Sequence, residues 1–317
     1  MFVGHALFAF ALVAGLAGRV TDPRRALAYG AVAAAFAAVP DVDIGYALVG
    51  LGGALGSGAL DAGPLALAST FWETGNVVHR AVTHSLVVAP IAALAAAAWV
   101  DGRPLARLLA VALAAVLVAA ATILTGALAA TVTFAFAAAC LVLATVVASR
   151  TTLGPGATFV LALVGLVSHP FGDFFTGEPP ALFYPISDLP LETVTLHPDP
   201  TLHLLAAFGI ELATVWAALL VWIRLREGPR VPRIDPKAAT GAAYAGLAFL
   251  IPAPTLDLSY PFVFSVLAVG LVGIAPRVRF RAREFSRPGP ERAVYTGLTA
   301  ITVAALAYAV VYLVTIG

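Results

Sequence analysis

Hydrophobic residues occur along the chain in runs of about 15–23 residues, the length that crosses the core of a bilayer. Short polar or charged segments separate these runs. Because backbone groups in lipid must be satisfied within their own segment, the pattern predicts helices. The predicted spans are residues 2–18, 26–40, 86–100, 104–124, 127–148, 156–169, 202–223, 238–253, 260–276 and 293–315.

One further apolar stretch, residues 44–60, is rich in glycine. Glycine weakens a helix interior, so this stretch is predicted to be re-entrant or interfacial rather than a span. Counting it as a span would also scatter the basic loops over both sides of the membrane.

Basic residues fall almost entirely in loops that ten spans place on one side. Seventeen of the 18 Lys and Arg residues lie there, and Arg80 is the exception. By the positive-inside rule that side is cytoplasmic, so both termini are predicted to be extracytoplasmic. The same topology puts every histidine at or near the outer face: His5, His79, His84, His169, His197 and His203. Any chemistry is therefore expected on the extracytoplasmic side.

Composition supports this assignment. Apolar residues make up 61% and charged residues 11% of the 317 residues, with a net charge of +1. A soluble domain is about half apolar and roughly a quarter charged. These values exclude a disordered chain, a coiled coil and an ordinary cytosolic enzyme, and they predict an all-α, polytopic integral membrane helical bundle in the cell membrane. The lipid bilayer is its expected partner and nucleic acid is not. The single Cys140 excludes an intrachain disulfide and a cysteine-rich metal cluster.

The first candidate motif is an HxxxD formed by His169 and Asp173. Positions i and i+4 share a helix face, so both side chains can reach one ion. The alternative is an ordinary solvated helix end.

The second motif is His79-Arg80-Ala81-Val82-Thr83-His84-Ser85, just before the span at 86–100. Thr83 is expected to cap that helix, which would leave His84 free to point into a site. Arg80 breaks the charge rule that the other arginines obey, and it would suit an anionic group such as phosphate. The alternative is a basic cluster that anchors a helix end.

Further candidates are carboxylates and a histidine next to or within spans. Asp41 and Asp43 follow Pro40 at the outer end of the second span, and His5 lies early in the first. Glu211 is the one charged residue well inside a span, with His203 eight residues before it. Ionisable groups in such places are costly and tend to be functional, although a solvated helix end or a hydrogen-bonded buried residue would also explain each one.

Several histidines and carboxylates at one face form the ligand set of Zn²⁺ or a related divalent ion. They could hold one ion, or two ions about 3.5–4 Å apart, as in enzymes that hydrolyse phosphoesters.

The order of these motifs resembles the YdjM family. The resemblance rests on His5, Pro40 to Asp43, His79 to Ser85 and His169 to Thr176, and it covers roughly residues 1–220. Members are described as inner-membrane, metal-dependent hydrolases, distantly similar to zinc-dependent phospholipase C. The resemblance implies a metal-binding set of His5, Asp41 or Asp43, His79, His84, His169 and Asp173. It also implies a metal-site core over residues 1–223 and a three-span extension over 224–317. The phospholipase pattern has a later HxxxE, whereas His203 and Glu211 are spaced differently, so the resemblance does not extend to a full three-metal site.

The resulting hypothesis is a membrane-bound hydrolase with an extracytoplasmic divalent-metal site, with zinc as the expected ion and a small-molecule or lipid phosphoester as the substrate. Arg80 would neutralise the substrate phosphate, and Asp41, Asp43 or Glu211 would act as the base. The competing hypotheses are a membrane transporter and a non-catalytic membrane protein with a structural metal. The sequence leaves the oligomeric state open.

Overall fold

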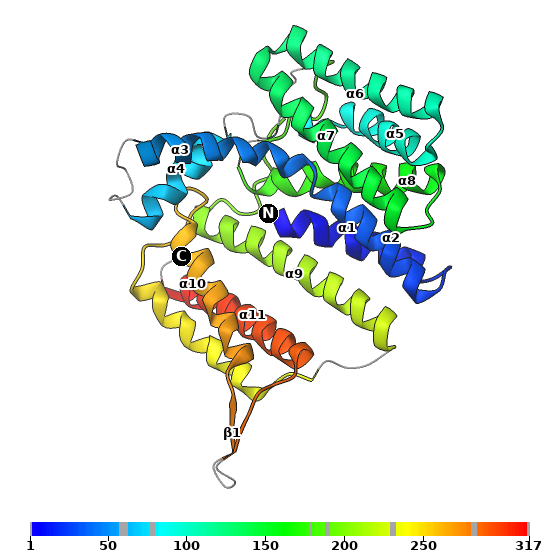
Figure 1. The fold of residues 1–317 in the computed structure, drawn as a ribbon. Coiled ribbons are helices and arrows are strands. Elements are labelled where there is room, and N and C mark those ends of the chain that lie inside the picture. The colour runs from blue at the N-terminus through cyan, green and yellow to red at the C-terminus, as the bar shows by residue number, and fades with distance from the viewer. Residues whose placement is uncertain are drawn as a thin grey trace. The chain divides into compact units, whose positions relative to one another are not determined.

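The computed structural model describes residues 2–56, 63–76, 80, 82–177, 179–187, 191–228, 233–279 and 284–315. Every predicted span overlaps a helix (Figure 1). These helices are α1 (Phe2–Ala17), α2 (Pro23–Ala37), α5 (Val88–Asp101), α6 (Pro104–Leu124), α7 (Ala127–Arg150), α8 (Pro155–Ser168), α9 (Pro200–Glu227), η5 (Pro236–Phe249), α10 (Tyr260–Val269) with η6 (Gly270–Ile274), and α11 (Pro290–Thr315).

Six helical segments of the described chain are long and apolar enough to cross a membrane by length and composition. They are Pro23–Ala54, Pro104–Leu124, Ala127–Arg150, Pro155–Phe175, Pro200–Glu227 and Pro290–Thr315. The protein is therefore a multi-pass helical membrane protein. The regions of α1, α5 and α10 contain shorter apolar helices, so the number of ten spans and their orientation stay predictions.

The helix boundaries have local causes. Helices α2, α6, α8, α9 and α11 each begin with proline. Proline lacks the N–H that would be unsatisfied at a first helical position, and its φ already suits a helix. Asp22 adds a cap to α2, because its Oδ1 accepts the Arg25 N–H at 3.1 Å. Gly102 ends α5 in the left-handed conformation, at φ 76°.

The chain divides into two compact units, and the first comprises residues 1–194 with 214–228. In this unit α1 packs against α2, α2 against α8, and α5 against α6, α7 and α8. Gly165 permits the close approach of α8 to α2, since a Cβ there would collide with the Ala33 carbonyl and lie 2.8 Å from the Ala37 nitrogen. Small residues let membrane helices pack this tightly.

Short 3₁₀ helices extend three helix ends of this unit: η1 (Pro40–Tyr46), η3 (Val82–His84) and η4 (His169–Phe175). Helix α3 (Ala47–Gly56) follows η1 and packs against α4 (Pro64–Asn76), which the sequence pattern did not predict. The described part of the glycine-rich stretch 44–60 is thus helical.

The second unit comprises residues 195–213 with 229–317, so α9 contributes to both units. Its aromatic core contains Tyr244, Phe262 and Tyr308, whose ring centroids lie 5.2–6.0 Å apart. Strands β1 (Arg277–Arg279) and β2 (Glu284–Ser286) form an antiparallel pair in this unit. The expected boundary between 1–223 and 224–317 stays a prediction.

Candidate metal centre

Four helix ends of the first unit bring the candidate side chains together. His5 comes from α1, Asp41 and Asp43 from η1, and His84 from η3. His169 and Asp173 both come from η4, whose first turn contains Pro170. Their spacing was expected to reflect one α-helical turn, but the segment is a 3₁₀ helix, as proline in its first turn permits. The two side chains still face each other.

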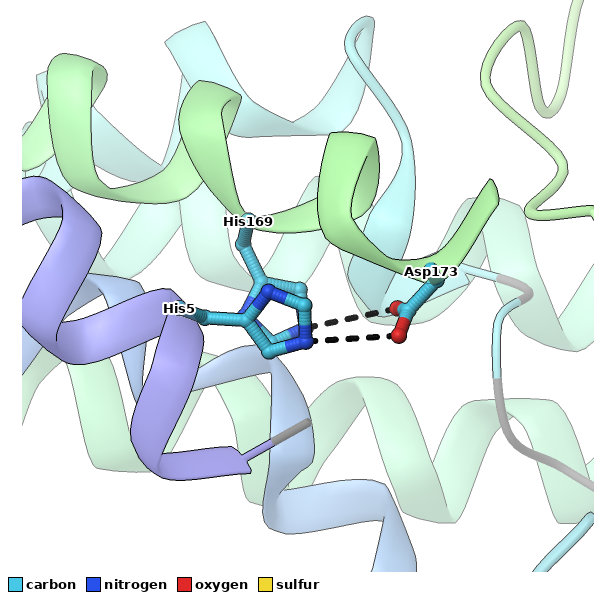
Figure 2. Close-up of side chains that lie close together, drawn as sticks. All are labelled: His5, His169 and Asp173. Carbon is cyan, nitrogen blue, oxygen red and sulfur yellow. Dashed lines mark ion pairs between the residues drawn. The ribbon is translucent and has the colours of Figure 1, made fainter. Parts of the chain in front are cut away.

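Asp173 lies among three histidines. Its Oδ1 is 3.3 Å from His5 Nε2, and its Oδ2 is 3.1 Å from His84 Nε2 and 3.9 Å from His169 Nε2. Figure 2 shows His5 and His169 pointing toward the Asp173 carboxylate from two different helices. All four residues are 0–4% exposed. The carboxylate is therefore enclosed by imidazole nitrogens rather than solvated.

His169 is held so that Nε2 faces the cluster. Its Nδ1 lies 2.6 Å from the carbonyl oxygen of Ala37. A carbonyl oxygen only accepts, so Nδ1 carries the hydrogen and the neutral ring presents an Nε2 lone pair. This Nε2 is 2.9 Å from His84 Nε2. Two nitrogen lone pairs at that distance repel each other unless a proton or a metal ion lies between them.

The two neighbouring carboxylates of η1 have different partners. Asp41 Oδ1 lies 3.5 Å from His169 Nε2. Asp43 Oδ2 accepts a hydrogen bond of 2.6 Å from the Thr83 hydroxyl and lies 3.6 Å from His84 Nδ1. The buried Asp41 Oδ2 and Asp173 Oδ2 have no hydrogen-bond partner among the described residues.

Thr83 does not cap α5, contrary to the expectation from sequence. The N-cap residue is Val87, and the Ser85 Oγ in the turn before it accepts the N–H groups of Val87 at 3.0 Å and Val88 at 3.2 Å. Ser85 also donates to the carbonyl of Tyr184 at 2.5 Å. The residue after His84 thus anchors the histidine-bearing turn.

Arg80 lies at the edge of the cluster, in a left-handed conformation with φ 68°. Its Nη2 donates to the Thr176 carbonyl at 3.0 Å and lies 3.7 Å from Asp173 Oδ1. A Cβ on Gly177 would lie 2.8 Å from Arg80 Nη1, so glycine leaves room for the guanidinium. The Arg80 side chain is 15% exposed, against 2% for Asp173, so Arg80 is the more accessible group.

A comparison with known families assigns the chain. The model of the YdjM inner membrane protein family matches residues 1–230. The chain belongs to the YdjM family. No curated protein and no solved structure matches the chain. Every residue of the cluster lies within the part that matches the YdjM family.

The YdjM-family cluster suits a divalent ion. His5, His169 and Asp173 each offer a ligand atom within 4.8 Å of the others, and so do Asp41, His84 and His169. The nitrogen and carboxylate atoms around Asp173 and His84 are 2.9–3.9 Å apart. Zinc bonds of about 2.0–2.2 Å to a tetrahedral set need donor atoms about 3.3–3.6 Å apart. The donor set and its spacing therefore fit.

The arrangement of the first unit does not test the other predicted site residues. His79 lies outside the described residues. Glu211 belongs to the part of α9 in the second unit, so its role stays a prediction. His203 Nδ1 accepts the Leu196 N–H at 3.1 Å, and His197 Nδ1 accepts the Asp199 N–H at 3.0 Å. These last two histidines have local structural partners.

Sequence reasoning missed three contributors to the site. The Ala37 carbonyl carries no side-chain signal, and the Thr83 hydroxyl was assigned to a cap. Gly172 is the third, since a Cβ there would lie 2.5 Å from His5 Cε1. A glycine between His169 and Asp173 leaves space for the ring of His5. The presence of glycine inside the HxxxD motif was the sequence signal for this close approach.

Proposed function

We propose that this protein is a membrane-embedded, metal-dependent hydrolase of lipid phosphoesters, with its site at the extracytoplasmic face. The proposal rests on one observation: the Nε2 atoms of three buried histidines lie within 3.9 Å of the buried carboxylate of Asp173. Membership of the YdjM family supports a membrane setting.

We assign the ion to the Nε2 atoms of His5, His84 and His169 and to Asp173, with zinc as the ion that this donor set suits. A single ion is favoured, because the Ala37 carbonyl occupies His169 Nδ1 and leaves this ring one nitrogen to offer. When bound, a divalent ion polarises a phosphoryl oxygen and activates water.

The charged residues that are not proposed ligands have two proposed roles, as the general base and as the group that binds the substrate phosphate. Asp41 is the proposed base: its Oδ1 faces His169 Nε2 and its Oδ2 has no hydrogen-bond partner among the described residues. Asp43 is already engaged by Thr83, so it suits this task less well. Arg80 would bind the substrate phosphate from the more accessible edge of the cluster.

The surroundings of the cluster favour a lipid over a soluble ester. Phe171 lies between His169 and Asp173 in η4, is 50% exposed and stacks on Phe174 with centroids 6.4 Å apart. Helix α3 begins directly after η1, and its Leu48 and Val49 are 66% and 61% exposed. Apolar side chains next to a buried polar centre suit acyl chains beside a phosphate headgroup.

Burial of the ligands favours a second candidate, a metal that only ties helix ends together, since the four proposed ligands are 0–4% exposed. Asp41→Asn separates the two functions. In the hydrolase, this change abolishes turnover and keeps the metal. In the structural alternative, the unchanged protein hydrolyses nothing.

The test uses the full chain purified in detergent. Metal content is measured by elemental analysis, and hydrolysis is assayed on phospholipid vesicles and on a water-soluble aryl phosphate. We expect bound zinc, phospholipid hydrolysis that a chelator abolishes, and weaker activity on the soluble ester. The control is Asp22→Asn, an exposed helix cap that should retain full activity. Metal-free protein, or protein inert on both substrates, would refute the proposal.

A further inference from the structure

We infer that Asp43 and Thr83 are a positioning pair that fixes the tautomer of His84, holding its Nε2 lone pair toward the cluster. The inference rests on the proposed metal site and adds two residues to it that are not ligands. It reassigns Asp43, which sequence placed among the ligands and bases.

The hydrogen-bond directions follow from counting protons. The Thr83 hydroxyl has one hydrogen, and it is donated to Asp43 Oδ2 over 2.6 Å. Thr83 Oγ1 can then only accept from His84 Nδ1, which lies 2.8 Å away. His84 Nδ1 therefore carries the ring hydrogen, and Nε2 of the neutral ring is left with a lone pair.

Thr83 is needed because Asp43 is too far from the ring to act alone. The direct distance from Asp43 Oδ2 to His84 Nδ1 is 3.6 Å, beyond a hydrogen bond. The hydroxyl bridges that gap. Asp43, Thr83 and His84 are 1–4% exposed, so water does not compete for these groups.

The same orientation is produced for His169 by a different acceptor. There the Ala37 carbonyl accepts from Nδ1. Two histidines from different helices thus present Nε2 toward each other, one held by the backbone and the other by a hydroxyl–carboxylate pair. Partners that orient a ligand histidine typically change metal affinity about 10–100-fold when removed.

The experiment compares Thr83→Val, which keeps the shape and removes the hydroxyl, with Thr83→Ser, which keeps the hydroxyl. The matched control is Thr133→Val, a fully buried threonine whose hydroxyl donates to the Ala129 carbonyl of its own helix at 2.7 Å. Zinc affinity of the full chain is measured in detergent by competition with a chromophoric chelator. We expect about 10–100-fold weaker binding for Thr83→Val only. Equal affinities for Thr83→Val and Thr133→Val would overturn the inference.

A second readout does not depend on metal or on a mutant that folds. Nitrogen-15 spectra of the metal-free wild type report which ring nitrogen of His84 carries hydrogen. We expect hydrogen on Nδ1, whatever the protonation state of Nε2, and Thr83→Val should lose this preference where that variant folds. A His84 Nδ1 without hydrogen in the wild type would refute the positioning pair. A wild type with the Nδ1–H form but without zinc affinity would refute the proposed metal site instead and leave the tautomer assignment standing.

Discussion

At the residue scale, Asp173 is the acid that contacts two histidines of the cluster most closely. Its carboxylate lies within 3.3 Å of both His5 Nε2 and His84 Nε2. Asp173→Asn keeps the shape and removes the charge. We expect about 10–100-fold weaker metal binding, since a carboxylate that ligates or orients a ligand contributes on that scale. Bound metal is read by elemental analysis after dialysis.

Asp199→Asn is the comparison for that variant. Asp199 precedes α9, and the Leu202 N–H donates to its Oδ1 at 2.8 Å, which lowers the pKa of this carboxyl. Asparagine caps a helix about as well as aspartate, so this change should leave metal content unaltered. If Asp173→Asn also retained all its metal, the central ligand would be lost from the proposal.

The sequence identified which residues were candidates for the site, but it did not predict which contacts each of them makes. His169 and Asp173 share a motif, and Asp41 and Asp43 stand at a span end, so each was a candidate. The different partners of Asp41 and Asp43 depend on η3 approaching η1 from about forty positions along the chain. No local pattern encodes such a contact.

At the element scale, the packing of α8 on α2 aligns His169 with its acceptor. A Cβ at Gly165 would strike the Ala33 carbonyl, so Gly165→Ala should push the helices apart and weaken the bond from His169 to Ala37. We expect destabilisation of about 1–3 kcal/mol, as overpacking typically costs, together with weaker metal binding. Thermal unfolding in detergent and chelator competition measure the two effects.

Gly156→Ala supplies the control on the same helix, since a Cβ there meets nothing within 4 Å. Alanine in a helix is favoured over glycine by about 0.5–1 kcal/mol, so stability should hold or rise slightly. Equal behaviour of the two variants would mean that the crossing of α8 and α2 does not need glycine.

Helices were predictable from sequence where the length of an apolar run alone determines them. The span 104–124 coincides with α6, because its apolar run starts at a proline and is long enough to cross a membrane. The pattern missed α4, whose length of 13 residues and mixed composition fall below a span signal. It also missed the 3₁₀ form of η1, η3 and η4, because the turns that carry the site depend on packing between helix ends.

At the scale of the whole molecule, the topology predicts opposite accessibility for two exposed positions. Val20 lies in a basic loop predicted to be cytoplasmic, and Thr195 lies on the predicted outer side. In intact cells an impermeant maleimide should label Thr195→Cys, and it should label Val20→Cys only after permeabilisation. The native Cys140 is 2% exposed and gives little background. The reverse labelling pattern would place the proposed site on the cytoplasmic face.

The origin of the cluster in four separate helix ends has a consequence for biogenesis. His5 enters the membrane with α1, whereas Asp173 follows only after α8. At about 5–20 residues per second, the ribosome takes roughly 10–30 s to synthesise the chain between them. During that interval Asp41 and Asp43 lie at a span end without their histidine partners from η3 and η4. Unpaired carboxylates next to the membrane core are energetically costly. Loading of the proposed ion therefore follows insertion of α8, and nascent chains arrested before η4 should carry no metal.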